Sequence, residues 1–244
     1  DSVASRGLGD VYKRQIHTQY ILTSESEETG QAFITVDEAG QNTILVYGGA
    51  NMTLSATDVE MSVDAFIGAD FVVAQLEVPF EAIEQAFKIA RKQNITTVLN
   101  PAPAIELPKS LLELTDIIIP NETEAELLTG ISINNESDMK ETATYFLDLG
   151  ISAVLITLGE QGTYCAYQEQ YKMIPACNVK AIDTTAAGDT FIGAFLSELN
   201  KDLSNLESAI RLANQASSLT VQRKGAQACL LYTSDAADDL LCGD

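Results

Sequence analysis

The residues best suited to chemistry lie in one short stretch, Asp183-Thr-Thr-Ala-Ala-Gly-Asp-Thr-Phe191, where small residues precede a carboxylate. Gly188 permits a tight turn, and Ala186 and Ala187 carry no side chain that would block a ligand. An apolar helical pattern follows, so the free amides of the first helical turn would form an anion site around Asp189. A carboxylate in that position can take a proton from a hydroxyl while the amides hold a phosphoryl group in transfer. The alternative is an ordinary N-cap role for Asp189.

Charge and composition exclude several classes of partner. The formal net charge of −21 opposes binding to nucleic acid and to anionic membranes, which select surfaces rich in Lys and Arg. No apolar run approaches the roughly 18 residues needed to cross a bilayer, and the start carries no signal-peptide pattern, so we expect a cytoplasmic protein. The four cysteines include no C-x-x-C pair, which disfavours both a zinc site and a disulfide framework.

The elements that must position Asp189 alternate between strands and helices. Apolar runs predict strands at 71–76, 96–99, 117–120 and 153–157, and helical periodicity predicts helices at 80–92, 122–128, 139–149 and 205–221. A hairpin is predicted over 162–174, and Val179 and Ile182 indicate a strand that leads into the catalytic stretch. This alternation predicts an α/β protein whose mostly parallel sheet is covered on both faces.

Another hairpin precedes the α/β region. The segments 32–36 and 42–47 alternate between apolar and polar residues on either side of a turn, and 20–23 is also rich in β-forming residues. Faces that are only half apolar would suit a small sheet lying over another part of the molecule.

Polar or glycine-rich residues follow the predicted strands. Because parallel strands place their carboxyl ends at one edge of a sheet, where ligands bind in such folds, these residues would share one site. They are Glu77, Asn100, Asn121 with Glu124, Thr157–Gly162 and Asp183–Asp189.

The motifs at these strand ends resemble those of the ribokinase family, the PfkB type of sugar kinase. The resemblance covers about residues 16–227 and rests on QLEVP (75–79), NPAPA (100–104), PNETEAELLTG (120–130), TLGEQG (157–162), DTTAAGDTF (183–191) and RKGAQ (223–227). It implies a ribokinase-like three-layer α/β sandwich with a mostly parallel central sheet, plus a small β lid. It also implies phosphorylation of the 5-hydroxyl of D-ribose by ATP with Mg²⁺, giving ribose 5-phosphate. No Walker-type glycine–lysine loop is present, and the family uses none.

The resemblance assigns the chemistry of transfer to the opening stretch. Asp189 would be the general base, and Ala186, Ala187 and Gly188 would supply the amides of an anion hole. Positioning and electrostatic stabilisation of this kind are most of what phosphoryl transfer requires of a protein.

The resemblance assigns the nucleotide to three other segments. Asn121 and Glu124 would serve the phosphates, with Glu124 contacting Mg²⁺ through water; a helix-capping pair is the alternative. Asn214 would contact the adenosine side, and a solvated polar residue on a helix is its alternative. A loop would line the site, although its glycines also suit a hairpin connection. Its residues are Thr157, Leu158, Gly159, Glu160, Gln161 and Gly162.

The remaining implied contacts concern the sugar, an activating cation and a second protein copy. Glu77 and Asp189 would contact ribose, and Ala32 and Ile34 would be apolar lid residues above it. The family forms homodimers through the edges of this hairpin. An activating monovalent cation, usually K⁺, would be held largely by carbonyl oxygens, which suit a hard ion. The implied cation residues are Asp183, Thr185, Thr220, Arg223 and Gly225.

The two ends depart from the family pattern. VYKRQ near the start and LLYTSDAADDL near the end resemble translated sequencing-adaptor read-through. We therefore expect 1–15 and 229–244 to be non-native tails, 16–50 to be a partial β lid, and 51–228 to be the α/β nucleotide-binding and catalytic domain. Natural disordered tails are the alternative.

The family pattern begins with a sugar-binding segment that this sequence lacks, so we expect a fragment that binds ribose weakly or not at all. Two further readings stay open: a kinase of another sugar or of a nucleoside, and a nucleotide-binding module without catalysis. A general base inside an anion site disfavours the second of these readings.

Overall fold

The computed structural model describes residues 17–36 and 42–225, so both predicted tails lie outside the described residues. The chain divides into two compact units. The first unit comprises Asp1–Thr97 and Pro108–Leu114, and the second comprises Val98–Leu107 and Thr115–Asp244. None of the helices in the described part is long and apolar enough to cross a membrane.

The predicted N-terminal hairpin is confirmed in the first unit. Strands β1 (Gln31–Val36) and β2 (Asn42–Tyr47) pair antiparallel, with Phe33 opposite Leu45. Residues that lie opposite each other share a face of the sheet, and these two side chains are 54% and 69% exposed. A two-stranded sheet with such an open apolar face is marginally stable on its own.

The rest of the first unit is mostly helical. Its elements are η1 (Gly49–Thr53), α2 (Ala56–Met61), η2 (Val63–Phe66), β3 (Phe71–Ala74), α3 (Phe80–Lys92) and α4 (Lys109–Leu112). Phe66, Ile89, Ala90 and Ile95 form its core cluster. The sequence pattern did not indicate α2 or η2, and residues 20–23, which were rich in β-forming types, form no strand.

Strand β3 is shorter and less buried than predicted. It ends at Ala74 instead of Leu76, and Val73 is 44% exposed. Among the described strands β3 has β4 as its one neighbour, because it begins the strand order β3-β4-β5-β6-β7-β8. A strand at that position lacks the second neighbour that buries a central strand.

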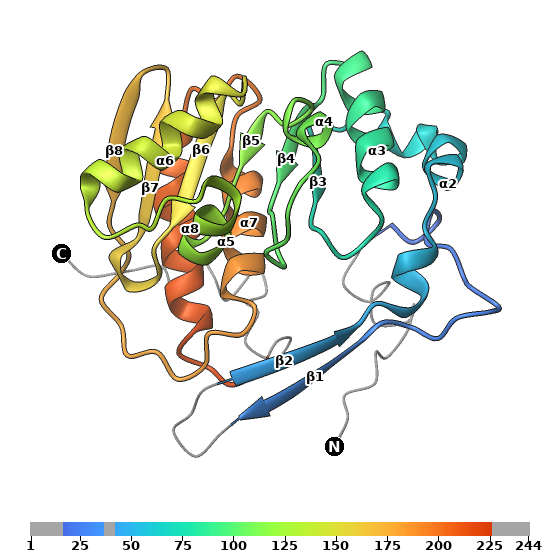
Figure 1. Cartoon of the computed structure of the whole chain (residues 1–244), viewed down its shortest axis with the longest axis horizontal. Coiled ribbons are helices and arrows are strands. Elements are labelled where there is room, and N and C mark those ends of the chain that lie inside the picture. Colours follow the sequence, from blue (N-terminus) through green and yellow to red (C-terminus); the bar gives the residue numbers. More distant parts are fainter. Residues whose placement is uncertain (1–16, 37–41, 226–244) are drawn as a thin grey trace. The chain divides into compact units, whose positions relative to one another are not determined.

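The sheet runs parallel from β4 to β6 (Figure 1). Strand β4 (Thr96–Leu99) pairs parallel with β5 (Ile117–Ile118), and β5 pairs parallel with β6 (Ala153–Thr157). Strands β7 (Thr163–Tyr167) and β8 (Gln170–Ile174) then add antiparallel, as the predicted hairpin requires. Helical connections join the earlier strands, which is what parallel neighbours need. The predicted mostly parallel sheet is confirmed.

Helices cover both faces of the sheet in the second unit. They are α5 (Glu122–Thr129), α6 (Glu136–Asp148), α7 (Ala187–Glu198) and α8 (Leu206–Thr220). The hydroxyl of Tyr171 on β8 lies 3.2 Å from that of Thr144 on α6, whereas the next residue, Lys172, pairs with Glu207 on α8. Because successive side chains of a strand point to opposite faces, α6 and α8 lie on opposite sides of the sheet.

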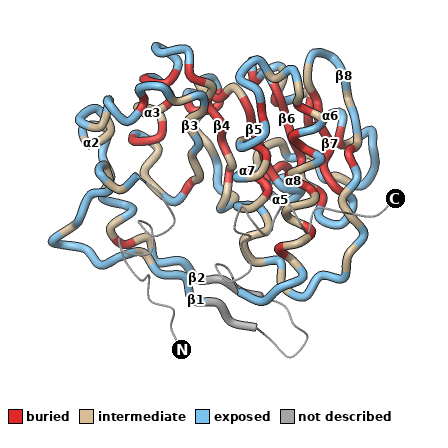
Figure 2. Tube along the Cα trace, turned by 180° about the vertical axis from the view of Figure 1, so that it is seen from behind, coloured by how far each residue is buried: buried red, intermediate tan, exposed pale blue. Residues whose placement is uncertain are grey.

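The core of the second unit lies between these layers. Leu155 and Ile156 of β6 and Tyr164 of β7 are almost completely buried, as are Phe146 of α6 and Phe195 of α7 (Figure 2). A sheet buried on both faces between two helical layers is the predicted three-layer sandwich, which is confirmed.

Candidate functional site

Asp189 lies in the first turn of α7 and is exposed. The N-cap residue of this helix is Ala186, and no side chain caps the helix start. Asp189 is the third residue of the helix, so the N-cap alternative for Asp189 is wrong. An exposed carboxylate therefore stands at the positive end of the α7 dipole, where anions are also favoured.

The turn before α7 depends on an unusual backbone conformation. Ala186 adopts the left-handed region, with φ 60° and ψ 13°, which residues other than glycine rarely adopt. The Ala187 amide donates to the Thr184 carbonyl at 3.2 Å, and the first helical bond runs from the Thr190 amide to the Ala186 carbonyl at 2.9 Å. The Gly188 amide consequently starts the helix without an intrahelical acceptor, as an anion site requires.

The segment that leads into this turn is not a strand. Residues 175–184 carry no strand, so the strand predicted around Val179 and Ile182 is wrong. The Ile182 and Asp183 amides instead donate to a single carbonyl, that of Val221 beyond α8, at 2.7 and 3.1 Å. Two separate loops, 182–185 and 220–225, are thereby held together.

The Asp183 carboxylate strengthens this junction. Its Oδ1 accepts the Thr185 amide at 2.9 Å, and its Oδ2 accepts the Gly225 amide at 3.0 Å. Hydrogen bonds from Thr185 first, and from the Gly225 amide second, lower the pKa of Asp183 below its ordinary value. Gly225 has φ 95°, a conformation that favours glycine. The structure thus brings together Asp183, Thr185 and Gly225, as the resemblance implied.

Thr220 and Arg223 border the same junction. The Thr220 carbonyl accepts the Arg223 amide at 3.1 Å. The Thr220 hydroxyl is buried and donates to the hydroxyl of Thr190 at 3.1 Å. Two loops that supply carbonyl oxygens and one carboxylate fit a hard monovalent cation. Among the described residues, no group of three His, Cys, Asp or Glu side chains could hold a metal ion by itself.

Asn121 and Glu124 form a reciprocal cap at the start of α5. The Asn121 side chain accepts the Glu124 amide at 2.8 Å, and Glu124 accepts the Asn121 amide and side-chain NH₂ at 2.8 and 2.9 Å. The alternative prediction, a helix-capping pair, is therefore confirmed. Glu124 is buried, and desolvation raises its pKa above the ordinary value. Such a pair fixes a carboxylate at a helix N-terminus, beside amides that favour phosphate.

The loop that follows β6 lies beside this pair. Asn121 forms a parallel bridge with Thr157, whose amide donates to the Pro120 carbonyl at 2.9 Å. Leu158 is buried and η3 (Gly159–Gln161) completes the connection from β6 to β7. The alternative prediction for this loop, a connection within a β-hairpin, is thus confirmed. The two motifs implied for the nucleotide therefore lie side by side at one edge of the sheet.

The two glycines of this loop differ. A Cβ on Gly162, where φ is 108°, would lie 2.2 Å from the Ile174 carbonyl oxygen and 2.6 Å from the Ala176 nitrogen. A Cβ on Gly159 would meet no atom within 4 Å. Gly162 therefore permits close packing on the end of β8, whereas the space beside Gly159 is open.

Asn214 is buried, so the alternative of a solvated helix residue is wrong. Its Oδ1 accepts the Thr163 hydroxyl at 2.8 Å, and its Nδ2 donates to the carbonyls of Ile174 and Pro175 at 3.0 and 3.2 Å. Asn214 therefore ties α8 to the start of β7 and the end of β8.

Apart from Asp189, the residues implied for the sugar belong to the first unit. Glu77 follows β3 and is exposed, and Ala32 is exposed on β1. The side chain of Ile34 lies outside the described residues, although its backbone belongs to β1. The structure thus places Asp189 and the nucleotide motifs in one unit and these sugar residues in the other.

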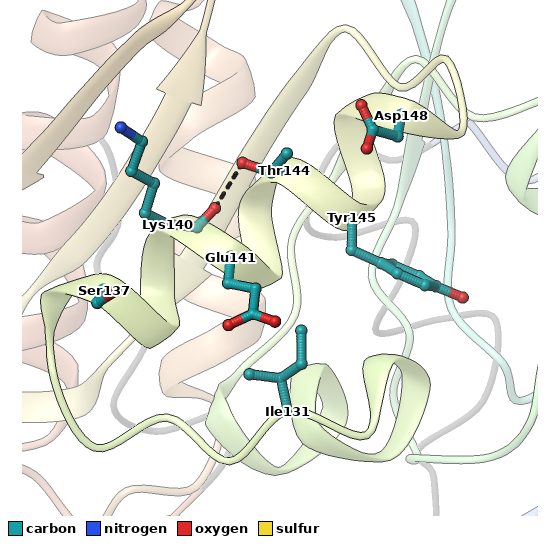
Figure 3. A pocket seen from close by; sticks show the side chains of 7 residues that line it. All are labelled: Ile131, Ser137, Lys140, Glu141, Thr144, Tyr145 and Asp148. Carbon is teal, nitrogen blue, oxygen red and sulfur yellow. Dashed lines mark hydrogen bonds between the residues drawn. The ribbon is translucent and has the colours of Figure 1, made fainter.

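Neither of two surface hollows in the second unit is lined by the predicted residues. One, of about 430 Å³, lies over α6 and includes Ile131, Lys140, Glu141 and Tyr145. Figure 3 shows Lys140 and Tyr145 pointing away from each other, and the drawn bond joins the Thr144 hydroxyl to the Lys140 carbonyl. Side chains that do not converge on one point form no catalytic group. Sequence reasoning assigned no role to Thr190, although it lies in the motif DTTAAGDTF, and it missed Ser217, which lies in no motif; both contact the start of α7.

Comparisons with known proteins agree with the family resemblance. The model of the pfkB family of carbohydrate kinases matches residues 1–233. A ribokinase of Staphylococcus aureus is 61% identical over 230 residues, which are 94% of this chain and 76% of that protein. A ribokinase of Haemophilus influenzae is 41% identical over 230 residues, 94% of this chain and 75% of that protein. The solved structure of Arabidopsis thaliana ribokinase complexed with ribose and ATP is similar with a TM-score of 0.82 and 30% identity, over 92% of this chain and 73% of that one.

Proposed function

The chain belongs to the pfkB family of carbohydrate kinases, and we propose that it is an ATP-dependent ribokinase. The observation that carries this proposal is the exposed carboxylate of Asp189 in the first turn of α7, beside the Gly188 amide, which has no intrahelical acceptor. The substrate assignment follows the ribokinases that this chain resembles. We also propose that the reaction takes place in the cytoplasm.

Asp189 acts as the general base. It takes the proton of the ribose 5-hydroxyl as the oxygen attacks the γ-phosphorus of ATP, and the bond from that phosphorus to the β,γ-bridging oxygen breaks. The products are ribose 5-phosphate and ADP. The amides of the predicted anion hole, Ala186, Ala187 and Gly188, stabilise charge on the transferring group, and the free amide of Gly188 is the best placed of them.

The nucleotide occupies the edge formed by Asn121, Glu124 and the loop Thr157–Gly162. The open space beside Gly159 allows the backbone to approach the ligand there. Mg²⁺ prefers to keep waters and to bind through phosphates with one or two carboxylates, and the Glu124 carboxylate at the start of α5 would serve it through water. Bound Mg²⁺ would neutralise charge on the phosphates. Asn214 serves this site by holding β7 and β8 in register with α8.

The activating monovalent cation, K⁺ by resemblance, belongs to the junction of loops 182–185 and 220–225. The residues that supply its oxygen ligands, or that hold the backbone carrying those oxygens, are Asp183, Thr185, Thr220, Arg223 and Gly225. A cation there would stabilise the loop that leads directly into the turn at Ala186.

The family resemblance assigns Glu77, Ala32 and Ile34 to ribose, the last two as apolar lid residues. We propose accordingly that residues 16–50 form a partial β lid and that residues 51–228 form the α/β nucleotide-binding and catalytic domain. The principal alternative is a kinase of another sugar or of a nucleoside. A nucleotide-binding module without catalysis is less favoured, because binding alone does not require the exposed carboxylate of Asp189.

A substrate panel tests the assignment. The chain is incubated with ATP and Mg²⁺ and, in turn, ribose, 2-deoxyribose, fructose and adenosine, and both ADP and the phosphorylated product are measured. Ribose is expected to give the highest kcat/KM, with the phosphate on the 5-oxygen. A higher kcat/KM for another acceptor would favour the alternative kinase, and calorimetric ATP binding without transfer to any acceptor would favour the binding module.

We also propose a homodimer through the β1–β2 hairpin. Phe33 and Leu45 lie opposite each other on one exposed face, which a second copy would cover. Replacing Phe33 by Asp is expected to convert a dimer to a monomer in sedimentation velocity. Met61→Asp, at an exposed residue of α2, is the matched control and should leave the dimer intact. A wild-type monomer at high protein concentration would refute the proposal.

A further inference from the structure

We propose that three hydroxyl side chains, those of Ser217, Thr190 and Thr220, are positioning residues that fix the anion-binding peptides at the start of α7. The inference rests on the proposed function of this site. None of the three hydroxyls needs to touch a substrate, because each acts on the backbone that carries the amides.

Ser217 fixes the peptide that contains the Gly188 amide. Its hydroxyl on α8 donates to the Ala187 carbonyl at 2.9 Å. The Ala187 carbonyl and the Gly188 N–H belong to one planar trans peptide, so they point in opposite directions. Holding the carbonyl toward α8 therefore directs the Gly188 N–H away from α8, at the first turn where an anion would bind.

Thr220 and Thr190 fix the preceding peptide through a relay of two hydroxyls. The buried Thr220 hydroxyl donates to Thr190 Oγ1 at 3.1 Å, and the Thr190 hydroxyl donates to the Ala186 carbonyl at 2.9 Å. The first donor sets the direction of the second, because a hydroxyl that accepts one hydrogen bond turns its own proton toward another acceptor.

Ala186 is the residue that needs this support. It holds a left-handed conformation although it has a Cβ, and such residues persist only where their surroundings over-determine them. Two α8 side chains one helical turn apart, Ser217 and Thr220, hold the two peptides that follow Ala186, Ser217 directly and Thr220 through Thr190. The last turn of α8 thus acts as a brace for the start of α7.

Ser218 provides a matched contrast on the same helix. It is buried, and its hydroxyl donates within α8 to the Asn214 carbonyl at 2.7 Å, not to α7. Ser217→Ala and Ser218→Ala each remove one serine hydroxyl from neighbouring positions of one helix. A merely structural role of α8 would make the two variants behave alike.

The first measurement is the backbone order parameter of the Gly188 amide, from ¹⁵N relaxation of the isotopically labelled full chain. Ser217→Ala is expected to lower it from a rigid value of about 0.85 toward about 0.6, while Ser218→Ala leaves it unchanged. An unchanged value in Ser217→Ala would overturn the proposal. This readout does not depend on catalysis, so it decides the inference even if the proposed function fails.

The second measurement is ribose phosphorylation, with kcat and both KM values determined separately. Ser217→Ala and Thr190→Val are each expected to lower kcat about tenfold, with the KM for ATP within about twofold, because misplaced amides stabilise the transferring group less. Thr190→Ser retains the hydroxyl and should restore kcat. Equal losses in Ser217→Ala and Ser218→Ala, or no rescue by Thr190→Ser, would overturn the positioning role. A wild-type chain that phosphorylates no acceptor would refute the proposed function instead.

Discussion

Asn214 of α8 accepts a hydrogen bond of 2.8 Å from the hydroxyl of Thr163, the first residue of β7, and both side chains are buried. The Asn214 NH₂ group meanwhile donates to two carbonyls at the end of β8, those of Ile174 and Pro175. One side-chain amide therefore satisfies three groups, at the start of β7, at the end of β8 and just beyond β8.

Replacing Asn214 and replacing Thr163 should both destabilise the protein, but by different amounts. Asn214→Ala leaves the Thr163 hydroxyl and two carbonyls without their partner and should cost about 2–4 kcal/mol, whereas Thr163→Val should cost about 1–2 kcal/mol. A double-mutant cycle by urea unfolding measures their coupling, which should be at least about 0.5 kcal/mol.

ATP calorimetry on the same variants separates a bracing role from direct contact. If Asn214 serves the nucleotide by bracing the strands, Thr163→Val lowers ATP affinity in the same direction as Asn214→Ala. Lost ATP affinity in Asn214→Ala alone, with unchanged stability, would instead indicate direct contact with the nucleotide.

The two loop glycines should respond differently to alanine. Gly162→Ala puts a Cβ 2.2 Å from a backbone carbonyl oxygen at a left-handed φ, so it should lower the free energy of unfolding by more than about 3 kcal/mol. Gly159→Ala meets open space and should cost only about 1 kcal/mol for its φ of 53°. Thermal unfolding of both variants checks this, and equal costs would contradict the packing role of Gly162.

Long periodic segments made much of the fold predictable from sequence. Helix Phe80–Lys92 and strands Thr96–Leu99 and Ala153–Thr157 have the predicted limits, because uninterrupted apolar periodicity specifies both their type and their burial. The predicted strand around Ile182 failed, since its amide bonds to the Val221 carbonyl, a contact that β propensity does not encode.

The sequence predicted which strand ends contribute to the site, but not the hydrogen bonds that connect the residues of the site. Asn121 and Glu124 carry a local spacing signal, so their capping geometry could be anticipated. Ser217 and Thr220 contact α7 across 30 residues of sequence, so the hydrogen bonds that join them to Ala187 and Thr190 could not be predicted from any local pattern. The burial of Asn214 was likewise hidden, because a polar residue on a helix usually faces water.

Thr142 should tolerate, and even favour, an apolar replacement. It is fully buried on α6, and its hydroxyl has no hydrogen-bond partner in the described part of the chain. Thr142→Val has nearly the same shape and removes an unsatisfied group, so it should raise the free energy of unfolding by about 1 kcal/mol.

Thr144→Val is the control for this change, because the Thr144 hydroxyl donates to the Lys140 carbonyl at 2.7 Å and lies 3.2 Å from the Tyr171 hydroxyl. It should be neutral or destabilising in urea unfolding. A loss of stability in Thr142→Val comparable to that in Thr144→Val would show that the Thr142 hydroxyl has a partner.

Ser110 should make stability depend on pH through Glu84. The Ser110 hydroxyl donates to Glu84 Oε1 at 2.6 Å and is the main cause of the lowered pKa of Glu84, with Lys88 a smaller one. A carboxyl whose pKa is lower in the folded than in the unfolded state stabilises the fold at pH values above its unfolded-state pKa, here 4.5. This stabilisation is lost as the pH falls through the folded-state pKa.

Ser110→Ala should therefore cost about 0.5–1 kcal/mol at pH 7, and the cost should shrink below pH 4.5. Urea unfolding across this range measures it. Ser208→Ala, which removes a hydroxyl bonded to the Asn205 carbonyl, is the control and should show a pH-independent difference. A cost for Ser110→Ala that does not vary with pH would exclude the Glu84 linkage.

The most direct test of the account replaces the proposed base. Asp189→Asn retains the shape of the side chain but removes the proton acceptor, and Glu198→Gln makes the same chemical change at the far end of α7. Ribose-dependent ADP formation is measured over a wide range of ribose concentrations, together with ATP binding by calorimetry. The account predicts a loss of turnover of at least about 10³-fold in Asp189→Asn, with ATP affinity within about threefold of wild type and Glu198→Gln unaffected. Turnover by Asp189→Asn equal to that of the wild-type chain would contradict the role of Asp189 and the account built on it.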